Sequence, residues 1–275
     1  MELVESAQEW AIAHVAKLAT GAPIDPSLRV TLNFHPDRLL DGVPVVEALV
    51  RDGCYRSQFE TGTSNGGLTA HPGGDRWAWE SRIFGGAYDG VPPVERPKYG
   101  SLNFRRRAIG GSPRFGSAHL RLRAEVSTRS TFCYPDSVFD PTHFGVAERL
   151  ALIDMAAADD QDLLDDYIEA QVHGPLLVGR DVEAVVLDPS YRGTDIERSA
   201  EKMACPVEWH DGFRLGVDEL QRHPDYRGPR YVELGLALAR DGHLDPRIIG
   251  DAARTGRYDE QALKRVWHYV ARFGT

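Results

Sequence analysis

Polar side chains alternate with apolar ones between residues 167 and 174, and their spacing suits a group that could do chemistry. With the two-residue period of a strand, every second side chain faces the same way. The residues that share one side are Tyr167, Glu169, Gln171 and His173. Glu169 is the carboxylate of this row, and no opposite charge lies near it in the sequence. The row either lines a cleft or forms the solvated face of an edge strand.

A histidine follows another apolar alternation, which ends at Phe34. His35 comes directly after this expected strand, and Arg38 lies three residues further on. A histidine at a strand end can point into a cleft and donate a hydrogen bond to a ligand hydroxyl. The alternative is a histidine in a turn with a capping role.

Residues 55–67 combine an arginine with several hydroxyl groups and glycines. Arg56 offers a planar fork for a phosphate. Thr63 and Ser64, with the backbone amides beside neighbouring glycines, suit anionic or sugar groups. The spacing matches neither a P-loop nor the dinucleotide fingerprint. The alternative is a polar surface loop in which Arg56 pairs with Glu60.

Metal-binding patterns are weak in this sequence, and we predict no metal ligand. There is no HExxH motif, no CxxC pair and no EF-hand loop. A metal-dependent hydrolase remains an alternative, with a ligand set drawn from His35, Asp37, His71 and Asp75. A serine hydrolase is disfavoured because no GxSxG elbow occurs.

The elements that must position these residues are strands mixed with helices. Apolar spacing predicts helices over residues 6–18, 43–50, 144–158, 231–240 and 260–272. Strands are expected over residues 28–34, 99–104, 117–122, 130–134, 167–174 and 182–187. Residues 55–97 are expected to be mostly loop, which in a compact domain is usually functional. We therefore expect an α+β domain over residues 1–190 and a helical extension over residues 191–275 that packs on it.

Composition limits the function. The 275 residues carry a formal net charge of −9, which argues against nucleic-acid binding through a basic face. Three cysteines far apart indicate a reducing compartment. The sequence begins without a signal-peptide pattern, and no apolar run approaches the roughly 20 residues of a membrane span. We expect a cytoplasmic protein without a membrane partner, and export by a route that leaves no such signal stays open.

Two sets of segments carry a resemblance to known families. Residues 32–38 (LNFHPDR), 55–67 (YRSQFETGTSNGG) and 84–88 (FGGAY) resemble an uncharacterised bacterial family of unknown function. A second set is similar to the closing blocks of bacterial ADP-ribosyltransferase toxin domains. It comprises residues 99–100 (YG), 114–116 (RFG), 129–137 (RSTFCYPDS), 167–174 (YIEAQVHG) and 181–186 (DVEAVV).

The second resemblance implies a bent, split β-sandwich of ADP-ribosyltransferase type, here with an N-terminal helix and a helical C-terminal extension. It implies that NAD is the substrate and that an early-strand residue binds it, either His35 or Arg56. Thr63 and Ser64 would supply the hydroxyl element, for which Ser130 and Thr131 also qualify. The late-strand Glu169 would be the catalytic residue. The remaining residues assigned to the site are Gln171, Tyr167 and Arg38.

Many family members carry Glu-x-Glu with the second Glu catalytic, whereas this chain has Gln171 at the second position. The resemblance implies an ADP-ribosyltransferase or an NAD glycohydrolase, with an acceptor expected to be a protein. Breaking the nicotinamide–ribose bond develops positive charge at the anomeric carbon, which an ionised Glu169 can stabilise. The alternatives are a non-catalytic nucleotide-binding or protein-interaction module and the metal-dependent hydrolase.

Overall fold

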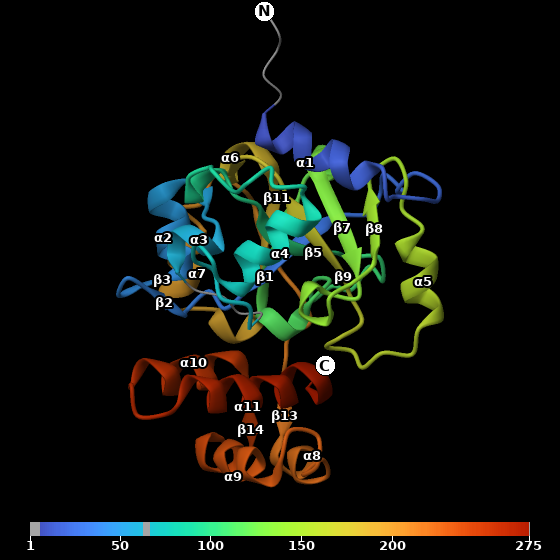
Figure 1. The fold of residues 1–275 in the computed structure, drawn as a ribbon. Helices are drawn as coiled ribbons and strands as arrows, with labels where there is room; N and C mark the ends of the chain where they lie inside the picture. The colour runs from blue at the N-terminus through green and yellow to red at the C-terminus, as the bar shows by residue number, and fades with distance from the viewer. Residues whose placement is uncertain (1–5, 63–66, 275) are drawn as a thin grey trace, which may run out of the picture.

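Eight strands form one mixed sheet in the computed structural model, which describes residues 6–62 and 67–274 (Figure 1). In spatial order they are β12 (Val207–Trp209), β11 (Val182–Leu187), β6 (Ala118–Leu122), β1 (Val30–Phe34), β5 (Lys98–Leu102), β9 (Ile168–Val172), β7 (Ser130–Tyr134) and β8 (His143–Val146). All neighbours pair antiparallel except β11 and β12, which are parallel. The predicted α+β class is confirmed. The strands that the resemblance places in a split sandwich belong to a single hydrogen-bonded sheet.

Three short strand pairs lie outside this sheet. They are β2 (Leu39–Leu40) with β3 (Val43–Pro44), β4 (Cys54–Tyr55) with β10 (Leu176–Leu177), and β13 (Leu215–Gly216) with β14 (His243–Leu244). The 3-10 turns are η1 (Pro93–Glu95), η2 (Pro113–Phe115), η3 (Ala124–Arg129), η4 (Ser137–Phe139) and η5 (Pro189–Tyr191).

The helices gather around the sheet and beyond one end of it (Figure 1). They are α1 (Ala7–Ala16), α2 (Val45–Asp52), α3 (Gln58–Thr61), α4 (Asp75–Ile83), α5 (Leu152–Ala158), α6 (Val178–Asp181), α7 (Asp195–Ala200), α8 (Val217–Gln221), α9 (Pro229–Leu238), α10 (Pro246–Arg254) and α11 (Glu260–Phe273). Within the described residues, no helix has both the length and the apolar character to cross a membrane.

The strand β9 lies inside the sheet, between β5 and β7. Each of its five residues is buried. Its register places Glu169 opposite Ser101 on one side and opposite Cys133 on the other. The alternative of a solvated edge strand is therefore wrong. The polar row is buried within the protein, so each of its polar groups needs a partner.

The sequence expectations for two segments need comparison with the observed elements. Residues 143–146 form β8 rather than the start of a helix, because their backbone pairs with β7 at the edge of the sheet. Residues 55–97, expected to be mostly loop, also contain the short helices α3 and α4. The first of these helices begins with a capping box, in which Ser57 and Glu60 each bond the other's backbone amide. A serine followed three residues later by a glutamate, as in this capping box, also fits the hydroxyl-rich composition expected of a ligand-binding loop.

The hydrophobic core is divided between the sheet and the C-terminal helices. The large core cluster runs from Leu28 to Met203 in sequence, and Trp209 packs against it. A second cluster is built mainly from residues 213–271. These helices form a separate layer at the bottom of Figure 1. The strand β12 belongs to the main sheet, and the second cluster takes up the chain from Phe213 onward.

Close contacts join the C-terminal layer to η2 and to the turn after β1. The Trp267 indole donates to the carbonyl oxygen of Pro113, at 3.1 Å. Gly250 of α10 lies against Asp37, where an added Cβ would come within 1.7 Å of a carboxylate oxygen. Arg254 pairs with the same carboxylate at 3.1 Å. The helical layer thus holds the 35–38 turn in place.

Gly116 permits another close approach, at the end of β1. An added Cβ there would lie 2.0 Å from the carbonyl carbon of Phe34, which is backbone and cannot move alone. We predict that Gly116→Ala lowers the free energy of unfolding by at least about 1–3 kcal/mol. Urea denaturation measures the loss. Gly90→Ala is the matched control, because nothing lies within 4 Å of its added Cβ. Equal stability of the two variants would contradict the packing described here.

Candidate active site

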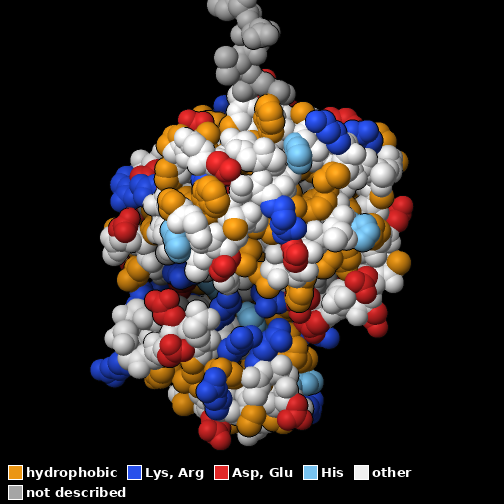
Figure 2. All heavy atoms as spheres, viewed as in Figure 1, with side chains coloured by type: hydrophobic (Ala, Val, Ile, Leu, Met, Phe, Trp, Pro, Cys, Tyr) orange, Lys and Arg blue, Asp and Glu red, His pale blue; other side chains and the backbone are white. Residues whose placement is uncertain are grey.

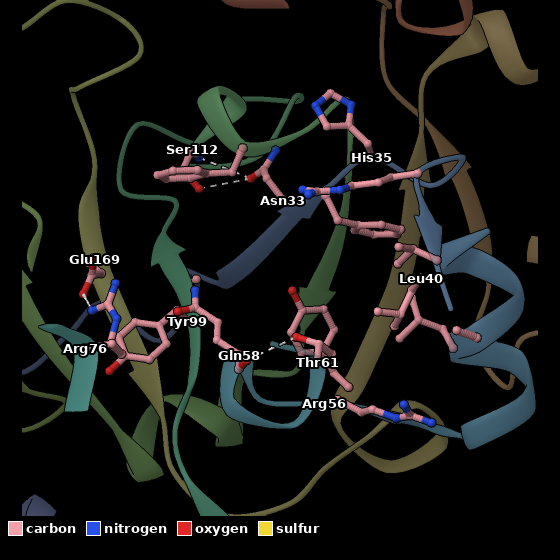
Figure 3. Close-up of a pocket in the computed structure, with 18 of the residues that line it drawn as sticks. Asn33, His35, Leu40, Arg56, Gln58, Thr61, Arg76, Tyr99, Ser112 and Glu169 are labelled. Carbon is pink, nitrogen blue, oxygen red and sulfur yellow. Dashed lines mark hydrogen bonds and ion pairs between the residues drawn. The ribbon is translucent and has the colours of Figure 1, made fainter. Parts of the chain in front are cut away.

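A pocket opens beside β1, β5 and β9, with α2 and α3 along its other side. Its empty volume is about 1260 Å³, including its open mouth. This figure counts the solvent at the mouth, so it describes an open pocket rather than a closed cavity. In Figure 3, Glu169, Arg76 and Tyr99 lie on one side of the pocket, and His35, Leu40 and Arg56 lie on the other.

The Glu169 carboxylate is held by hydrogen bonds from neighbouring strands and turns. Its Oε2 accepts from the Ser137 hydroxyl at 2.8 Å and from the Ser137 backbone amide at 3.3 Å. Its Oε1 accepts from the Gln171 amide at 3.0 Å. Both oxygens are therefore occupied, and the carboxylate has a fixed orientation at the pocket wall.

Arg76 provides the positive charge beside this carboxylate. Its guanidinium lies 3.7 Å from Glu169 Oε1 and donates to the Ser137 hydroxyl at 2.7 Å. The guanidinium also lies over the Tyr99 ring, 4.0 Å from its centroid. The side chains of Arg76 and Glu169 are 2% and 9% exposed, so this is a buried ion pair.

Burial has a clear electrostatic effect on Glu169. It raises the pKa of the carboxyl group, while Arg76 opposes this rise and Asp136 adds to it. The hydrogen bonds from Ser137 and Gln171 also lower the pKa, because they favour the charged form. A group of this kind is sensitive to each of its neighbours, which is typical of functional sites and also of structural ion pairs.

On the opposite side of the pocket, His35 packs edge-on against Trp267. The ring centroids are 4.9 Å apart and the planes cross at 83°. Burial and the neighbouring charges of Arg38 and Lys264 lower the pKa of His35 to about 3. The imidazole is neutral at pH 7, so it offers one donor and one acceptor rather than a charge.

Two arginines line this side of the pocket. Arg56 pairs with Asp52 at 2.6 Å, not with Glu60 as one alternative had it. Arg38 pairs with Glu260 of α11 at 3.7 Å. Both guanidinium groups remain partly exposed, at 29% and 39% for their side chains.

Positive charge collects near this part of the molecule despite the net charge of −9. Figure 2 shows Lys and Arg side chains along the hollow between the main body and the helical layer. Burial and the nearby charges of Arg114, Arg265 and Arg38 lower the pKa of Lys264 to about 8. This face is therefore locally positive although the chain as a whole is negative.

Most predicted site residues lie around this one pocket. His35, Arg38, Arg56, Tyr167 and Glu169 all line it. The Tyr167 hydroxyl donates to Asp136, which also lines the pocket. The structure thus brings together residues separated by more than 130 positions in the sequence.

The other predicted residues have different places. Gln171 is only 1% exposed and lies behind Glu169, so it orients the carboxylate and does not line the pocket. Thr63 and Ser64 lie outside the described residues. The competing Ser130 bonds the Val126 carbonyl, and Thr131 bonds Gln171, so neither hydroxyl lines the pocket.

The residues of the metal alternative do not form a cluster. Asp37 pairs with Arg254, and the Asp75 carboxylate accepts from the Thr69 hydroxyl at 3.1 Å. Within residues 6–62 and 67–274, no group of three or more His, Cys, Asp or Glu side chains is placed to hold a metal ion.

Sequence reasoning missed Arg76 and Ser137. The sequence carried a signal for Arg76, since the buried residues of α4 follow helical spacing and include two charged side chains. These buried residues are Arg76, Trp79, Glu80 and Ile83. Charged residues on the buried stripe of a helix indicate an internal ion pair. Ser137 closes the 129–137 block, but its contact with β9 depends on tertiary structure.

Comparison with known proteins gives one family and one structure to report. The family model described as "Protein of unknown function (DUF3626)" matches residues 29–161 and 146–273. A solved structure of Thermus sp. 2.9 DarT in complex with NAD+ is similar at 12% identity and a TM-score of 0.39, over 69% of this chain and 98% of that chain. No curated protein matches. The predicted resemblance to an uncharacterised family of unknown function is confirmed.

The buried pair of Arg76 and Glu169 gives a stability prediction. Arg76→Met leaves a buried carboxylate without its cation, and we expect a loss of about 3–5 kcal/mol in the free energy of unfolding at neutral pH. Since the folded pKa of this carboxyl already lies above its unfolded value, the loss grows as the pH rises through the folded pKa. Urea denaturation between pH 5 and 8 measures both effects.

Two further variants make this test specific. Adding Glu169→Gln to Arg76→Met removes the uncompensated charge and should restore most of the lost stability. Arg82→Met is the control, because Arg82 pairs with Asp140 at the surface and such pairs contribute about 0–1 kcal/mol. If the double variant is no more stable than Arg76→Met, the two charges are not coupled.

Proposed function

This chain belongs to the DUF3626 family of proteins of unknown function, and we propose from its pocket that it cleaves the nicotinamide–ribose bond of NAD. The observation that carries the proposal is the placement of Glu169. Its carboxylate lies on one side of an open pocket whose opposite side carries a neutral His35 and the cations Arg38 and Arg56.

The proposed reaction uses the charge of Glu169. As the carbon–nitrogen bond breaks, its electron pair leaves with nicotinamide and the anomeric carbon becomes positive. A fixed carboxylate stabilises this charge without reorganising at the moment of reaction. Ser137 and Gln171 fix it here, since they donate to its two oxygens. A nucleophile then adds to the anomeric carbon and loses its proton.

The other pocket residues suit the rest of the dinucleotide. Arg56 and Arg38 offer guanidinium forks to the pyrophosphate. His35 offers a neutral ring nitrogen to a ribose hydroxyl, and Tyr99 and Tyr167 provide aromatic surface at the pocket wall. The finer assignment of the sheet as a bent ADP-ribosyltransferase fold is part of this proposal, and it rests on the sequence blocks 129–137 and 167–174.

The acceptor decides between two forms of the activity. Transfer to a protein gives an ADP-ribosyltransferase, and transfer to water gives a glycohydrolase that releases free ADP-ribose. Incubation with NAD labelled in the adenosine half separates the two, because only transfer leaves the label on protein.

A nucleotide-binding module without catalysis is the second candidate. It is favoured by the ion pair with Arg76, because this cation reduces the negative charge that Glu169 presents to the pocket. Such a module would bind NAD and leave it intact.

Glu169 is the residue whose replacement tests the reaction. We expect Glu169→Gln to lower the rate of nicotinamide release at least about 100-fold, the scale seen when one electrostatic group is deleted, with little change in NAD affinity. Nicotinamide release is followed by chromatography, and NAD binding by calorimetry. Glu208→Gln is the control, because Glu208 pairs with Arg121 at the far edge of the sheet.

The outcomes of this experiment separate the candidates. NAD binding without cleavage by the parent protein supports the nucleotide-binding module. If the parent protein neither binds nor cleaves NAD, both NAD-based candidates are rejected. Cleavage that Glu169→Gln leaves unchanged rejects the role given to this carboxylate, and cleavage abolished by a chelator would favour the metal-dependent hydrolase.

A second prediction concerns the phosphate-binding side. Arg51 and Arg56 both pair with Asp52, at 2.8 and 2.6 Å, but only Arg56 lines the pocket. Arg56→Met should raise the KM for NAD roughly tenfold, the effect of losing about 1.4 kcal/mol of binding, and should change kcat little. Arg51→Met is the matched control. Equal effects of the two substitutions would remove Arg56 from the binding site.

A further inference from the structure

A chain of hydrogen bonds runs behind Glu169, away from the pocket. The Gln171 amide donates to Glu169 at 3.0 Å, and its carbonyl accepts from the Thr131 hydroxyl at 2.8 Å. Thr131 Oγ1 lies 2.9 Å from His173 Nε2. His173 Nδ1 lies 2.7 Å from the Tyr88 hydroxyl. We call these four residues, Tyr88, His173, Thr131 and Gln171, the relay.

Elementary hydrogen-bond chemistry fixes the direction of every bond in the relay. An ionised carboxylate only accepts, so when Glu169 is charged the Gln171 NH₂ group faces it and the Gln171 oxygen faces Thr131. Thr131 has one hydroxyl proton, which it gives to that oxygen. The contact with His173 must therefore be a donation from His173 Nε2–H to Thr131 Oγ1.

The protonation state of His173 completes this assignment. Burial and the charges of Arg129 and Lys98 lower the pKa of His173 to about 3, so the imidazole is neutral. With its proton on Nε2, its Nδ1 accepts, and the Tyr88 hydroxyl donates to it. All four bonds then point the same way, from Tyr88 toward Glu169.

The far end of the relay is formed by the FGGAY segment, residues 84–88. Phe84 meets the His173 ring edge-on at 5.1 Å, and Tyr88 stacks on it at 5.8 Å with the planes 9° apart. Phe84, Tyr88, Thr131 and His173 are each no more than 1% exposed. Water is therefore kept from these bonds, and a reversed Gln171 amide would place its carbonyl oxygen against the Glu169 carboxylate.

We propose that the relay is a positioning device for Glu169: it fixes the orientation of the Gln171 amide, and this amide holds the carboxylate in place and favours its charged form. Thr131, His173 and Tyr88 are then positioning residues for NAD cleavage, although none of them lines the pocket. Their effect on Glu169 is a property of the free protein, and its importance for catalysis rests on the proposed function.

The surroundings of Glu169 decide what a test can measure. The charged and titratable groups that face it are Arg76 of α4, Tyr99 of β5, Cys133 of β7, Asp136 ahead of η4 and Tyr167 ahead of β9. None of these is a member of the relay. A substitution within the relay therefore leaves the charges around Glu169 unchanged and alters only one hydrogen bond to it.

The test is a pH titration of the Glu169 carboxyl by ¹³C NMR, assigned with Glu169→Gln. Thr131→Val keeps the side-chain volume but removes the hydroxyl that orients Gln171. We expect the pKa of Glu169 to rise by about one pH unit, the effect of one hydrogen bond to a charged group. The acid limb of NAD cleavage should move upward by the same amount. An unchanged pKa would overturn the proposal.

Thr31→Val is the matched control. Thr31 is a fully buried threonine of β1 whose hydroxyl accepts from the Gly111 amide, outside the relay. It should lose stability on substitution but leave the pKa of Glu169 unchanged. An equal pKa rise in both variants would indicate general loosening of the sheet and would also reject the relay.

A second measurement is made on the protein with its relay intact. In ¹⁵N-histidine-labelled protein, His173 should remain neutral between pH 5 and 8 with its proton on Nε2, and His173→Gln identifies its signals. A charged ring, or a proton on Nδ1, would break the chain of donors and overturn the proposal. These two readouts do not require NAD. If they hold and NAD is not cleaved, the proposed function fails and the relay stands.

Discussion

The buried charge of Glu169 is the constraint on which the arrangement of this protein depends. A carboxylate in the protein interior is costly unless its charge is paired and its oxygens are hydrogen-bonded. Ser137 and Gln171 supply the hydrogen bonds, and Arg76 supplies the charge. These partners come from β9 itself, from the turn after β7 and from α4, so three distant segments must meet to stabilise the charged form of the carboxylate.

The same pocket has two sides of different electrostatic character. Glu169 and Arg76 neutralise each other on one side, whereas Arg38 and Arg56 remain partly exposed on the other. The helical layer acts on this second side, because Trp267 packs on His35, and Gly250 and Arg254 hold Asp37 two residues later. The C-terminal helices therefore contribute to the shape of the pocket even though their core is separate from that of the sheet.

Burial also explains why polar residues recur behind the site. Once Gln171 is buried to serve Glu169, its own carbonyl oxygen needs a donor, and Thr131 provides it. Thr131 in turn accepts from His173, and His173 accepts from Tyr88. Each polar group therefore needs the next one as a partner. The relay ends at Tyr88, whose ring packs into the hydrophobic cluster beside α1 and α4.

Local sequence determined the strands around the site, the N-terminal helix and the row that contains Glu169, because side-chain period and capping residues act within a few positions. It also placed His35, Arg38, Arg56 and Tyr167 among the candidates. Tertiary structure alone decided that β9 is an inner strand, that Gln171 is buried behind Glu169 without lining the pocket, and that Arg76 is the partner of Glu169. Those outcomes depend on strand order and on contacts between residues 36 to 93 positions apart, and no local pattern encodes which distant charge will compensate a buried one.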